Sequence, residues 1–501
     1  MTKNVNGFIR SSGKVLVNDG GEIQLTGWGI GNWLLCEGYM WDYQNSSRLD
    51  RPRRIEAVVR ELIGSEKSEQ FWQTYRENYF NLNDVKRIKK QGYNSIRLPL
   101  NWRLFMEEEP GIHFIESGFE IIDEVIKWCQ NEDMYLWLDL HGAPGGQTGA
   151  NIDDSIDDVP RLLLDADSFE KGLALWEEIA KRYASFEVIA GYDLLNEPIR
   201  TADPDRHYSD CEFLVPELIR FYEEAIQRIR QHDSNHCISI EGHHWATDTR
   251  VFDRQYDSNW VIHFHRYWDA PFIDIFEPFL ALSEKFQVPL WLGETGENRL
   301  EWFAAVTGIC DQNKISYHFW PYKKMGNDNC SVEIKRPNHW DDFIAYSKGG
   351  KKIPYQAALK LFNEYLRLIK TDHAILHDEV DQAILRNGTY RLNGINFDGH
   401  TILQNELNNE SRMETYALSN AGSIQYLKPN FNATKLCLVG KSNHIPAELA
   451  INGKGHLIKT NQFTLEITFE PKERGQIVDV ENKGQFPIQL DALTWIKGES
   501  N

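Results

Sequence analysis

The sequence has few cysteines, no long apolar run and no excess of positive charge. Its seven cysteines are scattered along 501 residues without close pairs, so they indicate neither a disulfide framework nor a zinc site. No stretch approaches the roughly 18 apolar residues that cross a bilayer. The formal net charge of −20 argues against a nucleic acid or an anionic membrane surface as partner.

The N-terminal residues Met1–Asn6 lack the charged and then apolar pattern of a signal peptide. We therefore expect a cytoplasmic protein, or an extracellular one if an export signal has been removed. Aromatic residues, by contrast, are plentiful: they make up 12% of the chain and include 16 tryptophans. Because flat rings pack well against the C–H faces of sugars, this composition favours a carbohydrate as partner. The sequence does not indicate an oligomeric state.

Near-continuous apolar runs are typical of parallel strands that are covered on both faces. We predict eight such strands, at Ile23–Trp28, Ser95–Pro99, Met134–Leu140, Val188–Leu195, Cys237–Glu241, Trp260–His265, Pro289–Gly293 and Ile315–Trp320. Amphipathic helical stretches separate most of them, for example Phe119–Gln130, Phe169–Tyr183, Pro216–Gln231 and Leu300–Gln312. This alternation predicts an α/β fold, a (β/α)8 TIM barrel, which we place at residues 1–371.

Three connections depart from the repeat. Gly242–Asn259 shows little helical pattern, and Gly142–Ser168 and Pro321–Gly350 are long. Long connections in a compact domain are often functional, and these two follow strand ends, where barrels place their chemistry. A helix at Tyr355–Ile369 is expected to close the barrel.

The pattern changes after about Asp372. Short alternating segments predict strands near Tyr390–Ile395, Glu414–Leu418, Lys435–Val439, Phe463–Phe469 and Gln476–Val480. Turn residues punctuate them at Asn387-Gly388, Asn393-Gly394, Asp398-Gly399 and Asn452-Gly453. We predict an antiparallel β-sandwich at residues 372–501, either a structural buttress or a carbohydrate-binding module. Trp495 is its only tryptophan, which favours the buttress.

Two stretches, Leu194–Pro198 and Leu292–Gly296, place a glutamate directly after a short apolar run. Cleavage of a glycosidic bond needs two carboxyl groups, one to protonate the leaving oxygen and one to lie ionised beneath the anomeric carbon. A lone glutamate after a strand is usually a solvated loop residue, and Asn196 before Glu197 is also typical of a helix start. The pairing of Glu197 with Glu294 favours catalysis over both alternatives.

Other polar and aromatic residues also stand at predicted strand ends. They are Arg97, His141, His265, Tyr267 and Trp320. In a barrel they would converge with the two glutamates on one face, although they are scattered along the sequence.

With these motifs the chain resembles the family 5 glycoside hydrolases, and within them the exo-β-1,3-glucanase branch, over roughly residues 7–370. The resemblance rests on Gly29–Glu37, Ile96–Pro99, Leu140–Gln147, Leu194–Pro198, Phe264–Tyr267 and Leu292–Gly296. It implies a retaining mechanism in which Glu197 is the general acid/base and Glu294 the nucleophile. Arg97 and Tyr267 would hold Glu294 ionised by a fixed charge and a hydrogen bond.

The same resemblance implies roles around the sugar. Asn196 would bind the 2-hydroxyl, His141 and His265 would hydrogen-bond the sugar or orient the carboxylates, and Trp320 would form the floor of the site. Glu37 would contact hydroxyls at the non-reducing end, which implies a closed pocket and exo action.

The chain departs from the branch in the connection after His141. Where the branch has an aromatic residue followed by aspartate, this sequence has Ala150 and Asn151. We keep Asn151 as a candidate substrate contact, and the departure leaves the preferred leaving group and linkage open.

The pairs His263/His265 and His243-His244 also invite a metal-hydrolase interpretation, because alternation places His263 and His265 on one side of a strand. No aspartate ends the last strand to complete such a site, so we expect neither a metal nor a cofactor.

We therefore expect a retaining β-glycoside hydrolase that acts from one end on short β-glucans or β-glucosides, with β-1,3 linkages favoured by the resemblance. One alternative is the same chemistry on another sugar, such as a β-mannoside or the glucose of a glycolipid. The other is a non-catalytic carbohydrate-binding protein, against which the retention of both glutamates, Arg97 and Tyr267 argues.

Overall fold

The structure is a computed structural model that describes residues 4–43, 45–202, 209–267, 269, 273–298, 300–385, 396–404, 415–427, 433–469 and 477–497. The chain divides into two compact units. The first comprises Met1–Tyr267, Pro278–Glu297 and Lys314–Leu376, and the second comprises Trp268–Glu277, Asn298–Asn313 and His377–Asn501. The second unit thus includes two short segments from within the part of the sequence that we assigned to the barrel.

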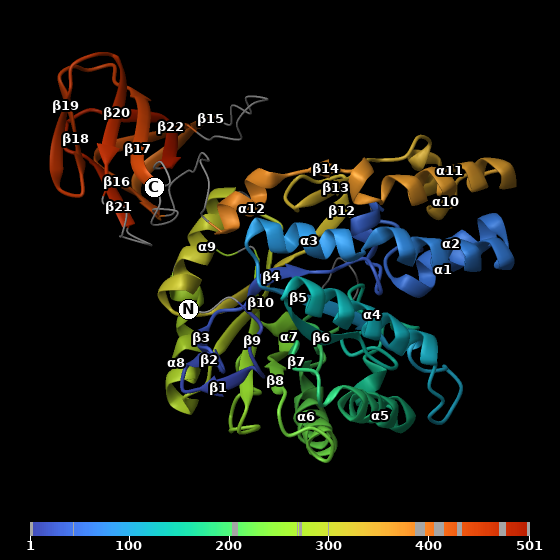
Figure 1. Ribbon diagram of the computed structural model, residues 1–501. Helices are drawn as coiled ribbons and strands as arrows, with labels where there is room; N and C mark the ends of the chain where they lie inside the picture. Colours follow the sequence, from blue (N-terminus) through green and yellow to red (C-terminus); the bar gives the residue numbers. More distant parts are fainter. Residues whose placement is uncertain are drawn as a thin grey trace. The chain divides into compact units, whose positions relative to one another are not determined.

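The first unit contains a closed barrel of eight parallel strands, which confirms the predicted α/β barrel (Figure 1). The strands, in order around the barrel, are β4 (Thr26–Gly29), β5 (Ser95–Asn101), β6 (Tyr135–Gly142), β7 (Ile189–Asp193), β8 (Cys237–Glu241), β9 (Trp260–Arg266), β10 (Leu290–Gly296) and β11 (Ser316–Trp320). Every residue of β5 to β8 is buried. Strands covered on both faces explain why these segments are so uniformly apolar.

Amphipathic helices follow the strands around the outside of the barrel. The helices α4 (Glu116–Glu132), α5 (Ala166–Tyr183) and α6 (Val215–Arg230) follow β5, β6 and β7 in turn (Figure 1). Each lies within a few residues of its predicted range, because a strong 3.6-residue periodicity marks one buried face. The helix α11 (Tyr355–Leu368) also agrees with the prediction.

The connection between β4 and β5 contains three helices, α1 (Pro52–Ile63), α2 (Ser65–Tyr79) and α3 (Leu82–Gln91). The start of α3 is defined by a capping box, in which the Asn81 side chain accepts a hydrogen bond from the backbone and Asp84 bonds back to the N–H of Asn81.

Two connections at the carboxyl ends of the strands agree with their predicted irregularity. Between β8 and β9 the only helix in the described chain is α7 (His243–Ala246), and its residues His244, Trp245 and Ala246 all have positive φ angles. The long connection after β11 contains the short strands β12 (Lys323–Met325) and β13 (Val332–Ile334) and the helix α10 (Trp340–Ser347).

The amino end of the barrel is closed by an N-terminal antiparallel sheet, β1 (Arg10–Ser12), β2 (Val15–Asn18) and β3 (Gly21–Ile23). Leu16 and Ile23 from this sheet share a buried cluster with Trp137 and Trp291 from the barrel interior. The two tryptophans stack with ring centroids 4.3 Å apart. This packing leaves the carboxyl ends of the strands as the open face.

The second unit contains α9 (Leu300–Gln312), α12 (Asp378–Leu385) and an antiparallel sheet of eight strands. The strands are β15 (Asn396–Gln404), β16 (Thr415–Leu427), β17 (Ala433–Lys441), β18 (Ala447–Ile451), β19 (Lys454–Ile458), β20 (Gln462–Thr468), β21 (Ile477–Asn482) and β22 (Ile488–Lys497). The long strand β16 pairs with β22 through its first half and with β21 through its second half. Both halves of the sheet therefore contribute to one core, which also contains Ala304 of α9.

Two predicted turns in this unit have different outcomes. Asn452 and Gly453, with φ angles of 48° and 76°, form the turn between β18 and β19 as predicted. The prediction of a turn at Asp398-Gly399 is wrong, because both residues lie within β15. Asp398 pairs with Ser423 and His400 with Leu418, so the extra residues at this shift in register belong to β16. The predicted strand Tyr390–Ile395 and the predicted turns Asn387-Gly388 and Asn393-Gly394 lie outside the described residues.

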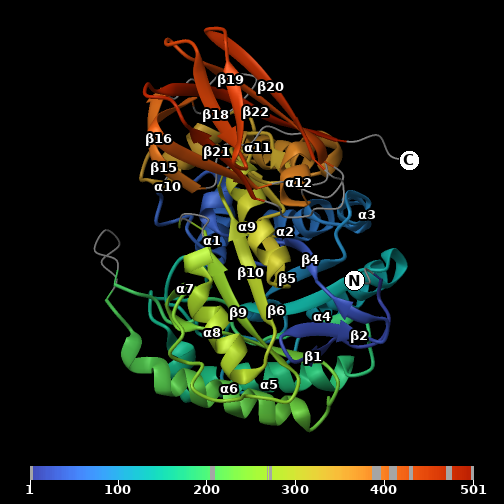
Figure 2. The same cartoon turned by 90° about the vertical axis from the view of Figure 1, so that its left-hand side faces the viewer.

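Within the described residues, no helix combines the length and the apolar character needed to cross a bilayer. The neighbouring strands β9 and β10 run side by side in parallel (Figure 2). Their register pairs His265 with Glu294, so the fold places two of the expected site residues next to each other.

Candidate active site

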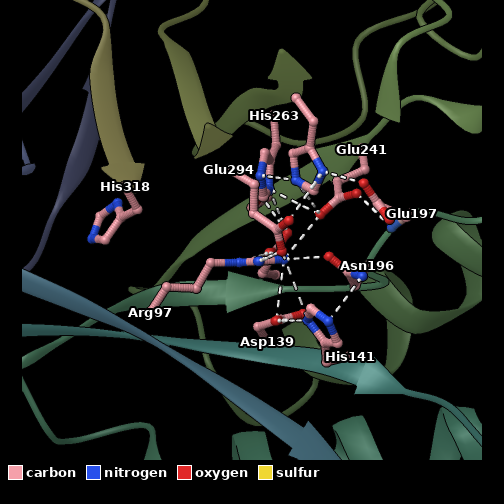
Figure 3. A network of polar contacts seen from close by, with 12 residues as sticks. Arg97, Asp139, His141, Asn196, Glu197, Glu241, His263, Glu294 and His318 are labelled. Carbon is pink, nitrogen blue, oxygen red and sulfur yellow. Dashed lines mark hydrogen bonds and ion pairs between the residues drawn. The ribbon is translucent and has the colours of Figure 1, made fainter. Parts of the chain in front are cut away.

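Several of the expected site residues meet at one end of the barrel. Figure 3 shows five of them in one network of polar contacts, namely Arg97, His141, Asn196, Glu197 and Glu294. Arg97 comes from β5, His141 from β6, His265 from β9, Glu294 from β10 and Trp320 from β11, while Asn196 and Glu197 directly follow β7. All of these side chains are buried. The barrel topology therefore gathers residues that are up to 223 positions apart in the sequence into one polar cluster.

Both carboxylate oxygens of Glu294 are bonded to protein groups. Nη1 of Arg97 forms an ion pair with Oε1, and the hydroxyl of Tyr267 donates a hydrogen bond of 2.7 Å to Oε2. Burial and the charge of Glu294 raise the pKa of Tyr267 well above its usual value, so the phenol keeps its proton and remains a donor. A fixed cation and a phenol together stabilise the negative charge that a nucleophilic carboxylate needs.

Arg97 is surrounded by three more buried acids. Its guanidinium lies 2.9 Å from Asp193, 3.1 Å from Asp139 and 3.2 Å from Glu241. Burial alone would lower the pKa of Arg97, but these carboxylates and Glu294 outweigh it and raise the pKa well above its usual value. The guanidinium is therefore a permanent positive charge at the centre of the site.

The backbone and side chain of Glu197 are both held in place. Its N–H donates to Oε2 of Glu241 at 2.7 Å, and its carbonyl accepts from the hydroxyl of Thr148 at 2.6 Å. These bonds hold Glu197 at φ 43°, a left-handed conformation that is unfavourable for a non-glycine residue. The strain turns the side chain back over the barrel mouth, where Oε1 lies 2.8 Å from Nδ1 of His265.

Burial and the charge of Glu294 raise the pKa of Glu197 well above its usual value. Glu197 is thus the member of the pair that holds its proton more tightly than an ordinary glutamate, while Glu294 is bonded to the cation of Arg97 and the hydroxyl of Tyr267. The two identical side chains therefore have different environments, one suited to a general acid and the other to a nucleophile, as a retaining glycosidase requires.

A chain of hydrogen bonds behind His265 supports this assignment. Nδ1 of His263 lies 2.9 Å from Asp193, and Nε2 of His263 lies 3.0 Å from Nε2 of His265. Burial lowers the pKa of both histidines, so both are neutral. With Asp193 as acceptor, His263 donates from Nδ1, His265 donates from Nε2 to His263, and the bare Nδ1 of His265 accepts the proton of Glu197.

The spacing of the pair matches one mechanistic class. An oxygen of Glu197, an oxygen of Glu294 and a ring nitrogen of His265 all lie within 4.8 Å of one another. Carboxyl groups of retaining glycosidases stand about 5–5.5 Å apart, whereas those of inverting enzymes stand roughly 6.5–9.5 Å apart to admit a water. The observed spacing is that of direct attack by one carboxylate.

The indole of Trp320 forms a flat wall beside the glutamates. Its ring stacks on His141 with centroids 4.9 Å apart and an angle of 12°, and its Nε1 donates to the hydroxyl of Tyr39 at 2.9 Å. A Cβ atom on Gly31 would lie 2.7 Å from the indole. The glycine is therefore required for the ring to occupy this place.

Glu37 and His141 line the same part of the site. Oε1 of Glu37 lies 3.7 Å from Nε2 of His141, and burial raises the pKa of Glu37 to about 7. Burial lowers the pKa of His141, but Asp139 at 2.7 Å outweighs it and raises the pKa to about 10. The imidazolium is thus a second cation beside the glutamates.

Asn196 and Asn151 differ in their surroundings. Oδ1 of Asn196 accepts a hydrogen bond of 2.9 Å from Arg97, which fixes the amide next to Glu197. Asn151 lies in a turn after β6 and is partly buried, next to the fully buried Ala150. Its contact with substrate stays a prediction.

Several residues that hold the site together were not predicted. Asp139 interrupts the apolar run of β6, and Asp193 and Glu241 are the last residues of β7 and β8. A carboxylate within or at the end of an apolar strand is the signal that could have indicated them. Gln147 ends the Leu140–Gln147 motif but was not predicted to have a role of its own. Its Nε2 donates to the carbonyls of His141 at 2.7 Å and Asn196 at 2.8 Å. It therefore joins the ends of β6 and β7.

Two groups in this site have the spacing of metal ligands. They are Glu241 with His263 and His265, and Glu197 with His265 and Glu294. In both, the histidine nitrogens belong to the hydrogen-bond chain from Asp193 to Glu197. A metal would have to displace that chain, so the donor set fits proton transfer better than coordination.

Comparison with known proteins finds similarity to glycoside hydrolases. The family model described as Cellulase (glycosyl hydrolase family 5) matches residues 58–326. A β-xylosidase of Phanerodontia chrysosporium is 30% identical over 311 residues, which cover 61% of this chain and 60% of that protein. A glucan 1,3-β-glucosidase of Schwanniomyces occidentalis is 24% identical over 234 residues, which cover 44% of this chain and 50% of that protein.

The matches span about half to three fifths of the length of these relatives. Among solved structures, that of endogalactoceramidase aligns with 97% of this chain and 100% of its own, with a TM-score of 0.52 and 13% identity. At that identity the likeness shows a shared fold.

Proposed function

Because this chain belongs to glycosyl hydrolase family 5, we propose that it hydrolyses β-glycosides with retention of configuration at the anomeric carbon. The observation that carries the proposal is the pairing of Glu197 and Glu294 within 4.8 Å, with the pKa of Glu197 raised by burial and by the charge of Glu294, and with Glu294 ion-paired to Arg97. A non-catalytic sugar-binding protein would have no need for this difference.

In the first step, a carboxylate oxygen of Glu294 attacks the anomeric carbon and forms a glycosyl ester, while Glu197 gives its proton to the leaving oxygen. The C–O bond to the leaving group breaks, and the alcohol departs. Arg97 stabilises the charge on Glu294 before attack, and Tyr267 keeps the carboxylate oriented.

In the second step, Glu197 is ionised and acts as a base. It takes a proton from a water that attacks the anomeric carbon, the ester bond to Glu294 breaks, and the sugar leaves with the configuration it had. The proton returns to Glu197, and the neutral His265 beside it accepts the hydrogen bond again.

We propose further that the enzyme acts from the non-reducing end on short β-glucans or β-glucosides. Glu37 and Trp320 support this, because both are buried beside the catalytic pair and offer a charged acceptor and a flat wall to one terminal sugar. The preference for β-1,3 linkages rests on the resemblance to the exo-β-1,3-glucanase branch and on the similarity to a glucan 1,3-β-glucosidase.

A β-xyloside is a second candidate substrate, because the β-xylosidase of Phanerodontia chrysosporium is 30% identical to this chain. Xylose lacks the hydroxymethyl group of glucose, so the two candidates differ only in how the pocket treats that group.

We also propose a reducing compartment, such as the cytoplasm, as the place of action. Cys36, Cys129 and Cys237 are free and buried, and burial raises the pKa of each thiol, that of Cys36 to about 12. Inert buried thiols are typical of proteins that do not depend on disulfides.

Three experiments test the proposal. A 2-deoxy-2-fluoro-β-glucoside with a good leaving group should trap an ester on Glu294, seen by peptide mass spectrometry, and NMR should show the β-anomer as the first product. An α-anomer, or an adduct on another residue, would overturn the mechanism. Initial rates on aryl β-glucosides, β-xylosides and β-mannosides, and on linkage-defined glucan oligosaccharides, identify the sugar and the linkage.

A further inference from the structure

A second cluster of titratable side chains lies in the connection between β8 and β9. His243, His244 and Asp248 place two ring nitrogens and a carboxylate oxygen within 4.8 Å of one another. Nδ1 of His243 lies 3.6 Å from Oδ1 of Asp248, and Nδ1 of His244 lies 4.0 Å from Oδ2. None of the three belongs to the hydrogen-bond chain of the proposed catalytic pair.

His243 has an unusual environment for a buried polar residue. The residue is 0% exposed, yet neither ring nitrogen has a hydrogen-bond partner in the described part of the chain. Nε2 of His244 is also buried without such a partner there. Because leaving buried polar atoms unpaired is costly, the arrangement indicates that a bound group satisfies at least one ring nitrogen of His243.

The distances fit the edge of a metal-ion polyhedron. Zinc binds histidine nitrogen and carboxylate oxygen at about 2.0–2.2 Å, so two ligands of a tetrahedral ion stand roughly 3.4 Å apart. The separation of 3.6 Å between His243 and Asp248 is longer than a hydrogen bond but within a few tenths of an ångström of that edge. A slight closure of His244 would complete three ligands.

The charges around the cluster favour a dication. Asp210 and Glu212 lie beside His244, and with Asp248 they supply three carboxylates. Arg250, whose Nε lies 3.0 Å from Oδ1 of Asp248 and whose Nη1 pairs with Glu212, supplies one cation. Three negative charges and one positive charge leave a net charge of −2 for the ion to balance.

The surroundings also provide an outer partner and a route of entry. Oδ1 of Asp210 lies 3.8 Å from Nε2 of His244, on the side away from Asp248, where a carboxylate would hold the second nitrogen of a metal-bound imidazole. The side chains of His244 and Asp248 are 15% and 25% exposed. An ion can therefore reach the site from solvent and then be held against the buried His243.

We propose that His243, His244 and Asp248 bind one divalent transition metal ion, preferentially zinc, as a structural site. The backbone N–H of His244 donates to the carbonyl of Ile199 at 2.9 Å, two residues after Glu197. A metal at this place would fasten the β8–β9 connection to the segment that carries the proposed acid. No step of the hydrolysis passes through the ion.

The test uses the full chain, stripped with a chelator and titrated with Co²⁺ and then Zn²⁺. We expect one equivalent of Co²⁺ with the visible absorption of a four- or five-coordinate site, displaced by Zn²⁺ with a micromolar or lower Kd. Zn²⁺ should also raise the Tm of the stripped protein by several degrees. His243→Asn and His244→Gln should weaken binding at least tenfold and remove the rise in Tm.

His339→Gln is the matched control, because His339 faces Asp342 at 3.2 Å on the surface and is 81% exposed in its side chain. It should bind zinc as the unaltered chain does. Asp248→Asn guards against misfolding, since an asparagine oxygen can still accept the hydrogen bonds from Arg250; the variant should keep the Tm of the stripped protein but lose the metal. No stoichiometric binding, or equal binding by the His243, His244 and Asp248 variants, would overturn the proposal.

Discussion

Nδ1 of His265 lies 2.8 Å from Oε1 of Glu197, and the hydrogen bonds behind His265 leave that nitrogen as an acceptor. His265 therefore does not remove the proton of Glu197. It accepts a hydrogen bond from the protonated carboxyl group and so fixes the direction in which the proton points. Because burial lowers the pKa of His265 well below its usual value, the ring competes weakly with Glu197 for the proton.

Replacing Glu197 by glutamine should separate leaving groups by their need for a proton. Hydrolysis of alkyl glycosides should fall by about 10²–10⁴-fold, the usual contribution of general acid catalysis. Glycosylation by a 2,4-dinitrophenyl glycoside, whose leaving group departs unprotonated, should be much less affected. Rates on both substrate classes are the measurement, and equal losses would show that Glu197 is not the acid.

The dependence of kcat/KM on pH should also show that Glu197 is the acid. Because the pKa of Glu197 is raised well above its usual value, kcat/KM should fall on the basic side only when Glu197 loses its proton, at a pH well above that at which an ordinary glutamate ionises. In Glu197→Gln that basic limb should disappear for activated substrates. A basic limb that persists unchanged in the variant would assign it to another group.

Tyr267→Phe should lower kcat by about 10–100-fold, because a hydrogen bond to a charged group contributes roughly 1.5–3 kcal/mol and this one orients Glu294. The KM should change little. Tyr192→Phe is a matched control, since that buried hydroxyl donates to Asp233 at 2.6 Å outside the site. Steady-state kinetics of both variants decide the matter, and similar losses in kcat would mean that both changes act through stability.

Glu37→Gln should raise the free energy of unfolding while it lowers the activity. Folding raises the pKa of Glu37 from 4.5 to about 7. Below pH 4.5 the carboxyl group is protonated in both the folded and the unfolded state and does not lower the free energy of unfolding. As the pH rises toward 7, the free energy of unfolding of the wild type falls by up to about 3 kcal/mol. The variant, which cannot ionise, keeps this stability. Urea unfolding at pH 4 and pH 8 should show a gain only at the higher pH.

Glu124→Gln provides the comparison for that experiment, because Glu124 is exposed on α4. Its unfolding free energy should equal that of the wild type at both pH values. A gain for Glu37→Gln at pH 4 that equals the gain at pH 8 would show that ionisation is not the cause.

Two substitutions of Trp320 should separate the contribution of its ring stacking on the sugar from that of its hydrogen bond to Tyr39. Trp320→Phe keeps a flat ring but loses the hydrogen bond to Tyr39, and we expect KM to rise by less than about tenfold. Trp320→Ala removes the wall, and loss of an aromatic contact area should raise KM by about 10–100-fold. If the two variants bind substrate equally well, the ring does not contact the sugar.

Removing His377–Asn501 should make the remaining chain insoluble. The helix α9 belongs to the second unit, where Ala304 lies in one core with Leu436 and Leu449. Truncation would expose that face of α9, whereas loss of a separate carbohydrate-binding module would leave a soluble, active barrel. Expression and gel filtration of the truncated chain distinguish the buttress from the module.

The sequence predicts the barrel well because each of its strands is an apolar run that reports burial locally. It also predicts that Glu197 and Glu294 lie at the barrel mouth, because a polar residue that follows such a run has only the mouth to occupy. Arg97 is predicted as a site residue too, although it lies within β5 and not at the end of the strand. It does not predict that Asp139, Asp193 and Glu241 surround Arg97, because the direction of a side chain within a strand depends on the closure of the whole barrel.

Tertiary context also decides the other differences. The periodicity of Leu300–Gln312 predicts the bounds of α9, but it does not reveal that this helix shares a core with strands more than 100 residues later. Asp398-Gly399 has the composition of a turn, yet β15 continues through it and pairs with β16 on both sides. Local composition predicts the type of secondary structure, whereas residues distant in the sequence determine which core or sheet the element joins.

The position of α9 between β10 and β11 in the chain has a consequence for synthesis on the ribosome. Glu294 and Trp320 leave the exit tunnel on either side of a helix whose partners have not yet been translated. During that interval the nascent polypeptide displays an apolar helix, a natural target for a chaperone. We expect stalled chains that end before His377 to be captured by such factors and full-length chains to be released.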